Sequence, residues 1–456
     1  MDLMNARKIN VIGGGLAGPE AALQAASFGC EVMLYEMRPR RATEAHQTAS
    51  FAELVCSNSL KSESENSAPW LLKQEMRRAG SFLLAAADAS AVPAGHALAV
   101  DREEFSRRVD ALIAANPRVT VVREEVTRLD EQADRITIVA TGPLTSPALT
   151  AEIERLTGSG HLSFYDSISP IVEASSIDMD KVYLAARWDR GTADYINCPF
   201  TKEEYERFLE ALASAETVPA KEWENIPTAE SVSNPRYFEG CLPIEEIARR
   251  GRDTLRFGPM KPAGLTNPKT GKWPYAVVQL RQENLRADSY NLVGFQNHLK
   301  FGEQARVLRL VPGLENATFL RYGQIHRNTY INAPAVLAET LQLREHRSIM
   351  VAGQLSGVEG YTESIASGML AGRYAASLAQ GLTPTPAPRE SANGSLSHYI
   401  THAEGKRFDP ANITFDLLPP LEESLRRKVR DKKERHRIQC ERALAAWDQW
   451  LALSCK

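Results

Sequence analysis

A glycine-rich turn close to the N-terminus is the feature that most constrains how this chain can fold. Residues 8–12 are apolar and typical of a short strand, and residues 16–28 are rich in alanine and typical of a helix. The turn between them carries the GxGxxG pattern of Gly13, Gly14, Gly15, Leu16, Ala17 and Gly18. Glycine at these positions permits a tight bend, close approach of a pyrophosphate to the backbone, and close packing of the helix on the strand. The pattern therefore predicts a Rossmann-type nucleotide-binding unit.

An acidic residue follows at the position that such a unit requires. Residues 32–35 form a second apolar stretch typical of a strand, and Glu36 stands at its end. A carboxylate at this position accepts hydrogen bonds from the hydroxyl groups of a ribose. A glycine-rich turn without a ligand is the alternative, but the order of strand, turn, helix and acid favours a dinucleotide.

Two later segments favour FAD over NAD as that dinucleotide. The apolar stretch 136–140 leads into Thr141 and Gly142, which resembles the ATG turn of flavoproteins with two dinucleotide-binding motifs. Residues 351–354, which include Gly353, precede a helix and resemble the C-terminal strand that faces the flavin in those proteins. Each segment alone is more often an ordinary strand and turn, whereas all three in this order predict an FAD-binding domain.

The distribution of predicted elements indicates an α/β fold with an insertion. Helices and strands alternate at first, strands and turns then dominate, and the alternation returns near the C-terminal third of the chain. We expect a discontinuous Rossmann-type FAD-binding domain at residues 1–170 and 330–382. An inserted α+β domain that binds the substrate is expected at 171–329, and a linker with a charged helical tail at 383–456.

Composition excludes several other classes of protein. The net charge of −3 over 456 residues argues against a protein that coats nucleic acid non-specifically, so any RNA contact must come from a local patch. The basic run at 426–437 is interleaved with acidic residues and is more typical of a solvated helix face. No apolar run approaches the roughly 20 residues that span a membrane, and glycines break the N-terminal apolar stretch, unlike a signal peptide. We expect a cytoplasmic protein.

The cysteines suggest thiol chemistry rather than disulfides or metal binding. All six are scattered, without a CxxC pair or a Cys/His ligand spacing, so no metal ligand is assigned. Cys56 has polar and cationic neighbours, and Cys241 lies in a Gly/Pro turn just before a helix. Both surroundings favour a thiolate. A small buried apolar side chain is the ordinary alternative for each, and for Cys198 in a similar turn.

Taken together, these residues resemble one family along nearly the whole chain, the folate- and FAD-dependent tRNA (uracil-5-)-methyltransferases, which are relatives of the GidA/MnmG tRNA-modifying flavoproteins. The matching stretches are residues 10–18, 35–39, 51–60, 92–95, 97–101, 140–144, 197–199, 238–241, 257–262, 278–281, 294–296, 326–329 and 357–361. Ala263 departs from the family pattern, in which a valine is expected, and the change is conservative. The resemblance implies methylation of the T-loop uridine of tRNA to ribothymidine. It also implies methylenetetrahydrofolate as one-carbon donor, FAD as cofactor and NAD(P)H as reductant.

The resemblance also implies roles for particular residues. It assigns Cys241 as the nucleophile that adds to carbon 6 of uracil, because this addition makes carbon 5 reactive. It assigns Cys56 as a second thiol, which helps to deprotonate carbon 5 or shields the reactive methylene, and the two thiols could exchange these roles. Tyr361 is expected near the flavin ring, and the uridine is expected to leave its base stack.

Two other functions stay open at this level. One is an NAD(P)H-dependent flavin oxidoreductase that acts on a small molecule, and the other is a non-catalytic RNA-binding protein that holds flavin for stability. A monomer and a homodimer are both compatible with the sequence.

Overall fold

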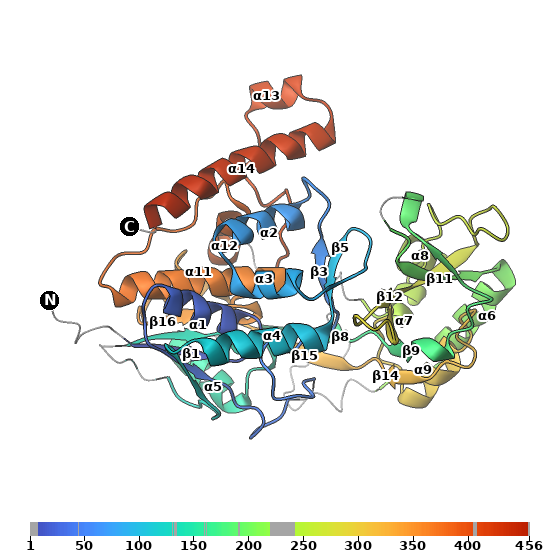
Figure 1. Ribbon diagram of the computed structural model, residues 1–456, viewed down its shortest axis with the longest axis horizontal. Helices are drawn as coiled ribbons and strands as arrows, with labels where there is room; N and C mark the ends of the chain where they lie inside the picture. The colour runs from blue at the N-terminus through green and yellow to red at the C-terminus, as the bar shows by residue number, and fades with distance from the viewer. Residues whose placement is uncertain are drawn as a thin grey trace.

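A computed structural model describes residues 8–43, 45–129, 131, 135–158, 160, 162–189, 192–218, 242–404 and 408–454. The side chains at 162–167, 325–327 and 454 lie outside this description. A larger body of helices over a parallel sheet lies beside a smaller body built around an antiparallel sheet (Figure 1). Strands β8 (Leu162–Ser167) and β15 (Ile325–Tyr330) pair with each other where the two bodies meet.

The parallel sheet is the base of the larger body. Its five strands run in the order β16 (Ile349–Val351), β7 (Arg135–Val139), β1 (Lys8–Ile12), β2 (Val32–Tyr35) and β6 (Val119–Val122). Val11 of the central strand β1 is fully buried, and it pairs in register with Leu34 of β2 and with Ile138 of β7. Because the strands are parallel, the loops after β1, β7 and β16 open at one edge of the sheet. This arrangement confirms the expected Rossmann-type α/β class.

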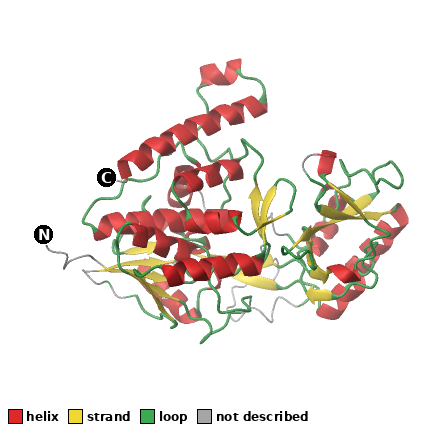
Figure 2. Ribbon diagram, in the orientation of Figure 1, coloured by secondary structure: helices red, strands yellow, loops and turns green. Residues whose placement is uncertain are grey.

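Helices cover this sheet in layers (Figure 2). The helices nearest the sheet are α1 (Ala17–Ser27) and α11 (Tyr361–Ala379), which pack tightly against each other. Further helices of the larger body are α2 (Ala68–Arg78), α3 (Phe82–Asp88), α4 (Arg102–Ala115), α5 (Pro147–Thr157) and α10 (Ala333–Val336). A small antiparallel sheet of β3 (Ser59–Ser62), β5 (Ala97–Val100) and β4 (Ala91–Val92) faces the second body.

The contact between α1 and α11 depends on glycine. A Cβ atom at Gly368 would lie 2.3 Å from the carbonyl oxygen of Ala17, and one at Gly372 would lie 2.4 Å from that of Ala21. Real Cβ atoms do not approach backbone atoms so closely, so the two helices could not keep this separation with any larger residue. The first turn of α1 therefore has a fixed position relative to α11.

The smaller body has its own sheet and its own core. Its strands follow the order β10 (Tyr183–Ala185), β11 (Tyr195–Phe200), β12 (Ala276–Gln282), β13 (Ser289–Leu292), β9 (Ile171–Glu173) and β14 (Phe319–Arg321), and each neighbouring pair is antiparallel. It also contains α6 (Lys202–Ala213), α7 (Ile244–Arg249), α8 (Thr254–Phe257) and α9 (Phe301–Leu308). Phe200, Phe208 and Phe295 belong to a hydrophobic cluster separate from that of the larger body.

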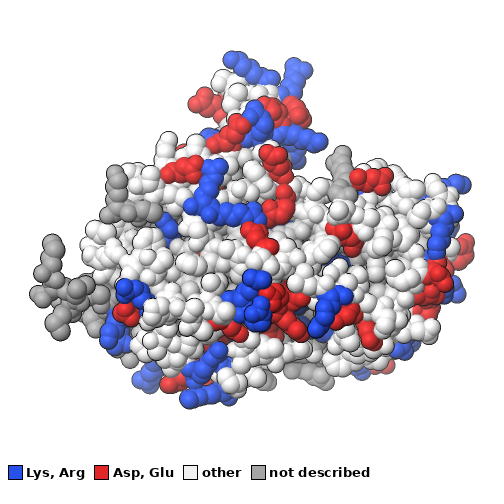
Figure 3. Space-filling view, viewed as in Figure 1, with Lys and Arg blue, Asp and Glu red and all other residues white. Residues whose placement is uncertain are grey.

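The C-terminal segment forms an outer layer over the larger body. It comprises α12 (Ala392–His402), α13 (Glu423–Lys428) and α14 (Lys432–Ser454). Trp447 is fully buried and donates its indole N–H to the carbonyl of Glu75 at 2.7 Å. Basic and acidic side chains are intermingled over this layer (Figure 3), and Arg437, for example, pairs with Glu434 at 2.6 Å. In the described parts of the chain, no helix is long and apolar enough to cross a bilayer.

We predict that Gly368→Ala lowers the midpoint of thermal unfolding, because its methyl group overlaps the backbone of α1. Overpacking of this kind costs about 1–3 kcal/mol. Gly302→Ala is the matched control, since Gly302 also lies in a helix and a Cβ atom there meets no atom within 4 Å. That control should be neutral or gain up to about 1 kcal/mol from helix propensity. Equal midpoints for the two variants would contradict the close contact.

Two buried glutamates hold the beginnings of helices in the larger body. Glu75 accepts hydrogen bonds from the backbone N–H groups of Ala392 and Asn393 at 2.7 and 2.9 Å, at the first turn of α12. Glu20 accepts one from the N–H of Leu83 at 2.8 Å, at the first turn of α3. Burial raises the pKa of Glu75 from its ordinary value of 4.5 to about 7, although the hydrogen bonds from Asn393 and Ala392 oppose this. Burial likewise raises the pKa of Glu20 to about 7.

We predict that Glu75→Gln changes the pH dependence of stability. Wild-type Glu75 stays protonated when folded but ionises when unfolded between its ordinary pKa of 4.5 and about 7. Protonated Glu75 thus makes its full contribution to the free energy of unfolding below the unfolded-state pKa. That contribution is lost as the pH rises through the folded-state pKa. As the pH rises through this window, the free energy of unfolding should therefore fall by about 1.4 kcal/mol less per pH unit in the variant than in the wild-type protein. Chemical denaturation at several pH values measures the difference, and identical slopes would contradict it.

Candidate active site

An open cleft lies at the edge of the parallel sheet where the strands end. Of the residues predicted to bind the cofactor, the lining includes Gly13, Gly14, Gly15, Leu16, Ala17, Glu36, Gly142, Gly353 and Tyr361. Gly18 lies behind the lining, where a Cβ atom would approach the carbonyl oxygen of Gly13 to 1.8 Å. The structure thus brings together residues from four separate segments of the chain.

The glycine-rich turn leaves free space where a pyrophosphate would lie. A Cβ atom at Gly13 would approach the carbonyl oxygen of Ala140 to 2.4 Å, so this glycine is needed for the fold. A Cβ atom at Gly15, in contrast, meets no protein atom within 4 Å. Helix α1 begins at this turn, and its N-terminus offers unpaired N–H groups and partial positive charge to an anion. These residues therefore fit the diphosphate of FAD.

Glu36 is held as a carboxylate at the end of β2. Its Oε2 accepts a hydrogen bond from the N–H of Gly14 at 2.7 Å, and its Oε1 accepts from Nε of Arg38 at 2.9 Å. Burial alone would raise the pKa of Glu36, but the hydrogen bonds and charge of Arg38 outweigh it and lower the pKa below its ordinary value. Glu36 is consequently a hydrogen-bond acceptor at neutral pH, as binding of a ribose requires.

Beside the cleft, the structure brings Cys56 and Tyr361 together, although they lie 305 positions apart in the chain. The phenol oxygen of Tyr361 accepts hydrogen bonds from the backbone N–H groups of Cys56 at 2.7 Å and of Ser57 at 3.3 Å. Burial, reinforced by the nearby Cys56, raises the pKa of Tyr361 above its ordinary value, so the phenol keeps its proton. Tyr361 stands at the start of α11 and thereby ties the Cys56 loop to the floor of the cleft.

Arg102 also holds the Cys56 loop, a role that no sequence pattern predicts. Its guanidinium donates to the carbonyl of Leu54 at 2.7 Å and to that of Cys56 at 3.4 Å, and it pairs with Glu283 at 2.5 Å. Burial lowers the pKa of Arg102, but the Glu283 carboxylate beside it more than offsets this and leaves the pKa raised. Arg102 stays charged and links the thiol loop to the smaller body.

Two further residues that sequence reasoning missed act in the same way. Arg281, on β12, donates to Oδ1 of Asn58 at 2.9 Å and to Oγ of Ser57 at 2.8 Å. The amide of Asn58 in turn donates to the carbonyl of Gln282 at 2.9 Å. Asn58 and Arg281 both lie in stretches that resemble the family, 51–60 and 278–281, and this resemblance is the available sequence signal for them.

The cysteines differ in their accessibility. Cys241 lies outside the described residues, so its place is still a prediction. Among the described cysteines, Cys56 is half-buried, whereas Cys30, Cys198 and Cys440 are buried. Burial raises the pKa of Cys198 well above its ordinary value and that of Cys440 to about 12, so both remain protonated thiols. The prediction of a turn at Cys198 was wrong: Cys198 lies within β11, pairs with Val278 of β12, and packs in the core of the smaller body.

The fold and the cleft together define a flavoprotein of the dinucleotide-binding class, and comparisons with known proteins narrow this class. The family model described as Glucose inhibited division protein A matches residues 8–383. The structure is similar to that of Aquifex aeolicus GidA in its form II crystal, with a TM-score of 0.67 over 99% of this chain and 74% of that chain, at 16% sequence identity.

Two sequence relatives are much more similar. The chain is 68% identical over 447 residues to the methylenetetrahydrofolate--tRNA-(uracil-5-)-methyltransferase TrmFO of Koribacter versatilis (strain Ellin345), with 98% of each chain covered. It is 61% identical over 448 residues to the protein of the same name from Solibacter usitatus (strain Ellin6076), with 97% of this chain and 98% of that one covered. The chain therefore belongs to the glucose inhibited division protein A family and, within it, to the TrmFO methyltransferases.

We predict that Gly15→Ala and Gly18→Ala separate cofactor binding from folding. The Gly15 variant should retain the thermal midpoint of the cofactor-free protein, because its new methyl group touches no protein atom. It should lose at least about tenfold in FAD affinity, because the methyl group lies where the diphosphate approaches. Gly18→Ala should lower the thermal midpoint of the cofactor-free protein, because its methyl group would overlap the carbonyl oxygen of Gly13. Flavin absorbance and thermal unfolding measure both effects, and undiminished FAD affinity of Gly15→Ala would place the diphosphate elsewhere.

Proposed function

We propose that this protein methylates carbon 5 of the T-loop uridine in tRNA and forms ribothymidine. Methylenetetrahydrofolate donates the carbon, and reduced FAD supplies the two electrons that convert a methylene into a methyl group. The observation that carries the proposal is the meeting of the dinucleotide cleft with the Cys56 loop at Tyr361. The printed names of the relatives, at 61% and 68% identity over nearly the whole chain, support the same substrates.

The chemistry explains why a thiol is needed beside this cleft. Carbon 5 of uracil is a weak nucleophile, and addition of a thiolate to carbon 6 converts the ring into an enolate that can attack a methylene. We assign Cys241 to this addition and Cys56 to the second role, removal of the carbon 5 proton or protection of the methylene. Release of the thiolate from carbon 6 then restores the double bond between carbons 5 and 6.

The residues around Cys56 support this assignment by holding its backbone. Tyr361 accepts the N–H group of Cys56, and Arg102 donates to its carbonyl, so the loop is held from both sides. Since the Tyr361 phenol stays neutral, this contact does not change with pH in the physiological range. A uridine that reaches Cys56 must leave its base stack, and flipping of this kind is general for enzymes that act on bases.

The proposal also covers the reductant, the cellular location, the oligomeric state and the roles of the domains. NAD(P)H reduces the flavin, the protein acts in the cytoplasm, and it works as a monomer or a homodimer. We assign FAD binding to residues 1–170 and 330–382 and substrate binding to residues 171–329. The separate sheets and separate hydrophobic cores of the two bodies support this division.

We predict that Cys241→Ala and Cys56→Ala each reduce ribothymidine formation at least about a hundredfold, since removal of a nucleophile or of its partner thiol blocks the reaction. FAD content should stay at the wild-type level in both variants. The assay incubates unmodified tRNA with labelled methylenetetrahydrofolate and NADPH and then analyses the nucleosides. Cys30→Ala is the control, because Cys30 is buried in the core away from the cleft and should leave turnover nearly unchanged.

Two outcomes would contradict the proposal. Wild-type product yield from Cys241→Ala would remove that residue from the role of nucleophile. NADPH oxidation at an equal rate with and without tRNA, and no labelled ribothymidine, would indicate an oxidoreductase that acts on a small molecule.

A further inference from the structure

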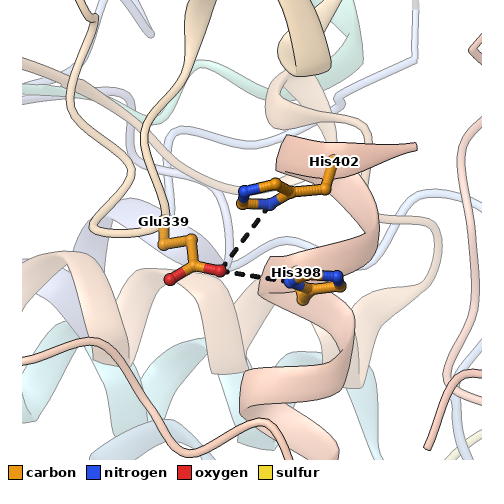
Figure 4. A group of neighbouring side chains, drawn as sticks. All are labelled: Glu339, His398 and His402. Atoms are coloured by element: carbon orange, nitrogen blue, oxygen red, sulfur yellow. Dashed lines mark hydrogen bonds and ion pairs between the residues drawn. The ribbon is translucent and has the colours of Figure 1, made fainter. Parts of the chain in front are cut away.

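Three potential metal ligands converge on the outer side of the larger body, away from the cleft. Glu339 lies in the segment between α10 and β16, and His398 and His402 lie on α12 (Figure 4). Oε1 of Glu339 lies 3.1 Å from Nδ1 of His398 and 3.6 Å from Nδ1 of His402. One ligand atom from each residue lies within 4.8 Å of the others. The lining of the cleft includes none of these residues.

The helix itself supplies a chelating pair. Residues four positions apart face the same side of an α-helix, so His398 and His402 present their rings together. The rings are stacked, with centroids 4.4 Å apart and planes inclined by 12°. The pair thus presents two imidazole rings on one side of α12, beside the carboxylate of Glu339.

The distances are close to those of a metal site. Zinc binds imidazole nitrogen and carboxylate oxygen at about 2.0–2.2 Å, and in a tetrahedron this places the ligand atoms about 3.3–3.6 Å apart. The two carboxylate–imidazole separations of 3.1 and 3.6 Å bracket this range. Because a metal lies in the plane of an imidazole that binds it, the stacked rings must rotate about their Cβ–Cγ bonds to share one ion. The hydroxyl of Thr401 lies 2.9 Å from Nδ1 of His402, and this contact restrains the His402 ring.

We propose that Glu339, His398 and His402 bind a divalent transition-metal ion, and that Zn²⁺ suits this ligand set best. Two imidazoles and one carboxylate are ligands that zinc prefers, and a water molecule completes the shell because the side chains are 40–45% exposed. The ion joins the segment that leads into β16 to the helix that follows the Pro-rich stretch. It is therefore a structural link between the flavin-binding sheet and the C-terminal layer.

The test is a Co²⁺ titration of the full-length, flavin-loaded protein without an affinity tag, after treatment with a chelator. Visible d–d absorption should saturate at about one Co²⁺ per chain, and Zn²⁺ should displace it. Glu339→Gln, His398→Gln and His402→Gln should each weaken the affinity at least about tenfold. His346→Gln is the matched control, because His346 forms a single pair with Glu131 at 3.2 Å and should not change the affinity.

A second measurement uses the wild-type protein alone. Zn²⁺ should protect His398 and His402, but not His346, from modification by diethyl pyrocarbonate, as read by peptide mass spectrometry. Equal Co²⁺ affinity in the wild-type protein and in all three ligand variants would overturn the proposal. Modification of His398 and His402 at the same rate with and without Zn²⁺ would overturn it as well.

Discussion

The close contact of α1 with α11 determines the geometry of the site. The first helix begins at the nucleotide-binding turn, and the second begins at Tyr361, so each places its N-terminus at the cleft. Gly368 and Gly372 allow the two backbones to touch, and this contact sets the distance between the two helix starts. Residues at both helix starts line the cleft, among them Ala17 and Tyr361. Packing far from the ligand therefore controls the shape of its binding site.

The Cys56 loop shows how the two bodies cooperate. Tyr361 holds it from the parallel sheet side, whereas Arg281 and Glu283 reach it from the end of β12, the latter through Arg102. Loss of one partner from a buried ion pair generally costs about 3–5 kcal/mol, because the other charge is left in a low-dielectric setting. The position of this thiol thus depends on how the smaller body docks, and a change of docking would alter it.

Sequence patterns predicted those features of the fold and the site that depend on residues close together in the chain. The turn at Gly13 to Gly18, the acid at Glu36 and the Rossmann-type sheet all follow from residues close together in the chain. Arg102 and Glu283 could not be predicted in this way, because 181 residues separate them and each alone resembles a surface charge. The histidines of α12 show their four-residue spacing in the sequence, but Glu339 joins them only through the packing of α10 on α12. The assignment of Cys241 rests on resemblance and is still a prediction.

The order of strands in the parallel sheet has a consequence for synthesis on the ribosome. Strand β7 is complete at Val139, but its outer neighbour β16 ends only at Val351. The nascent chain therefore carries β7 with an unpaired edge while all of the smaller body is translated, and an edge of this kind invites pairing with other chains. Helix α11 emerges later still, so the cofactor cannot help to fold the early segments. The discontinuous order of the strands thus leaves the parallel sheet incomplete until residues 349–351 have been synthesised.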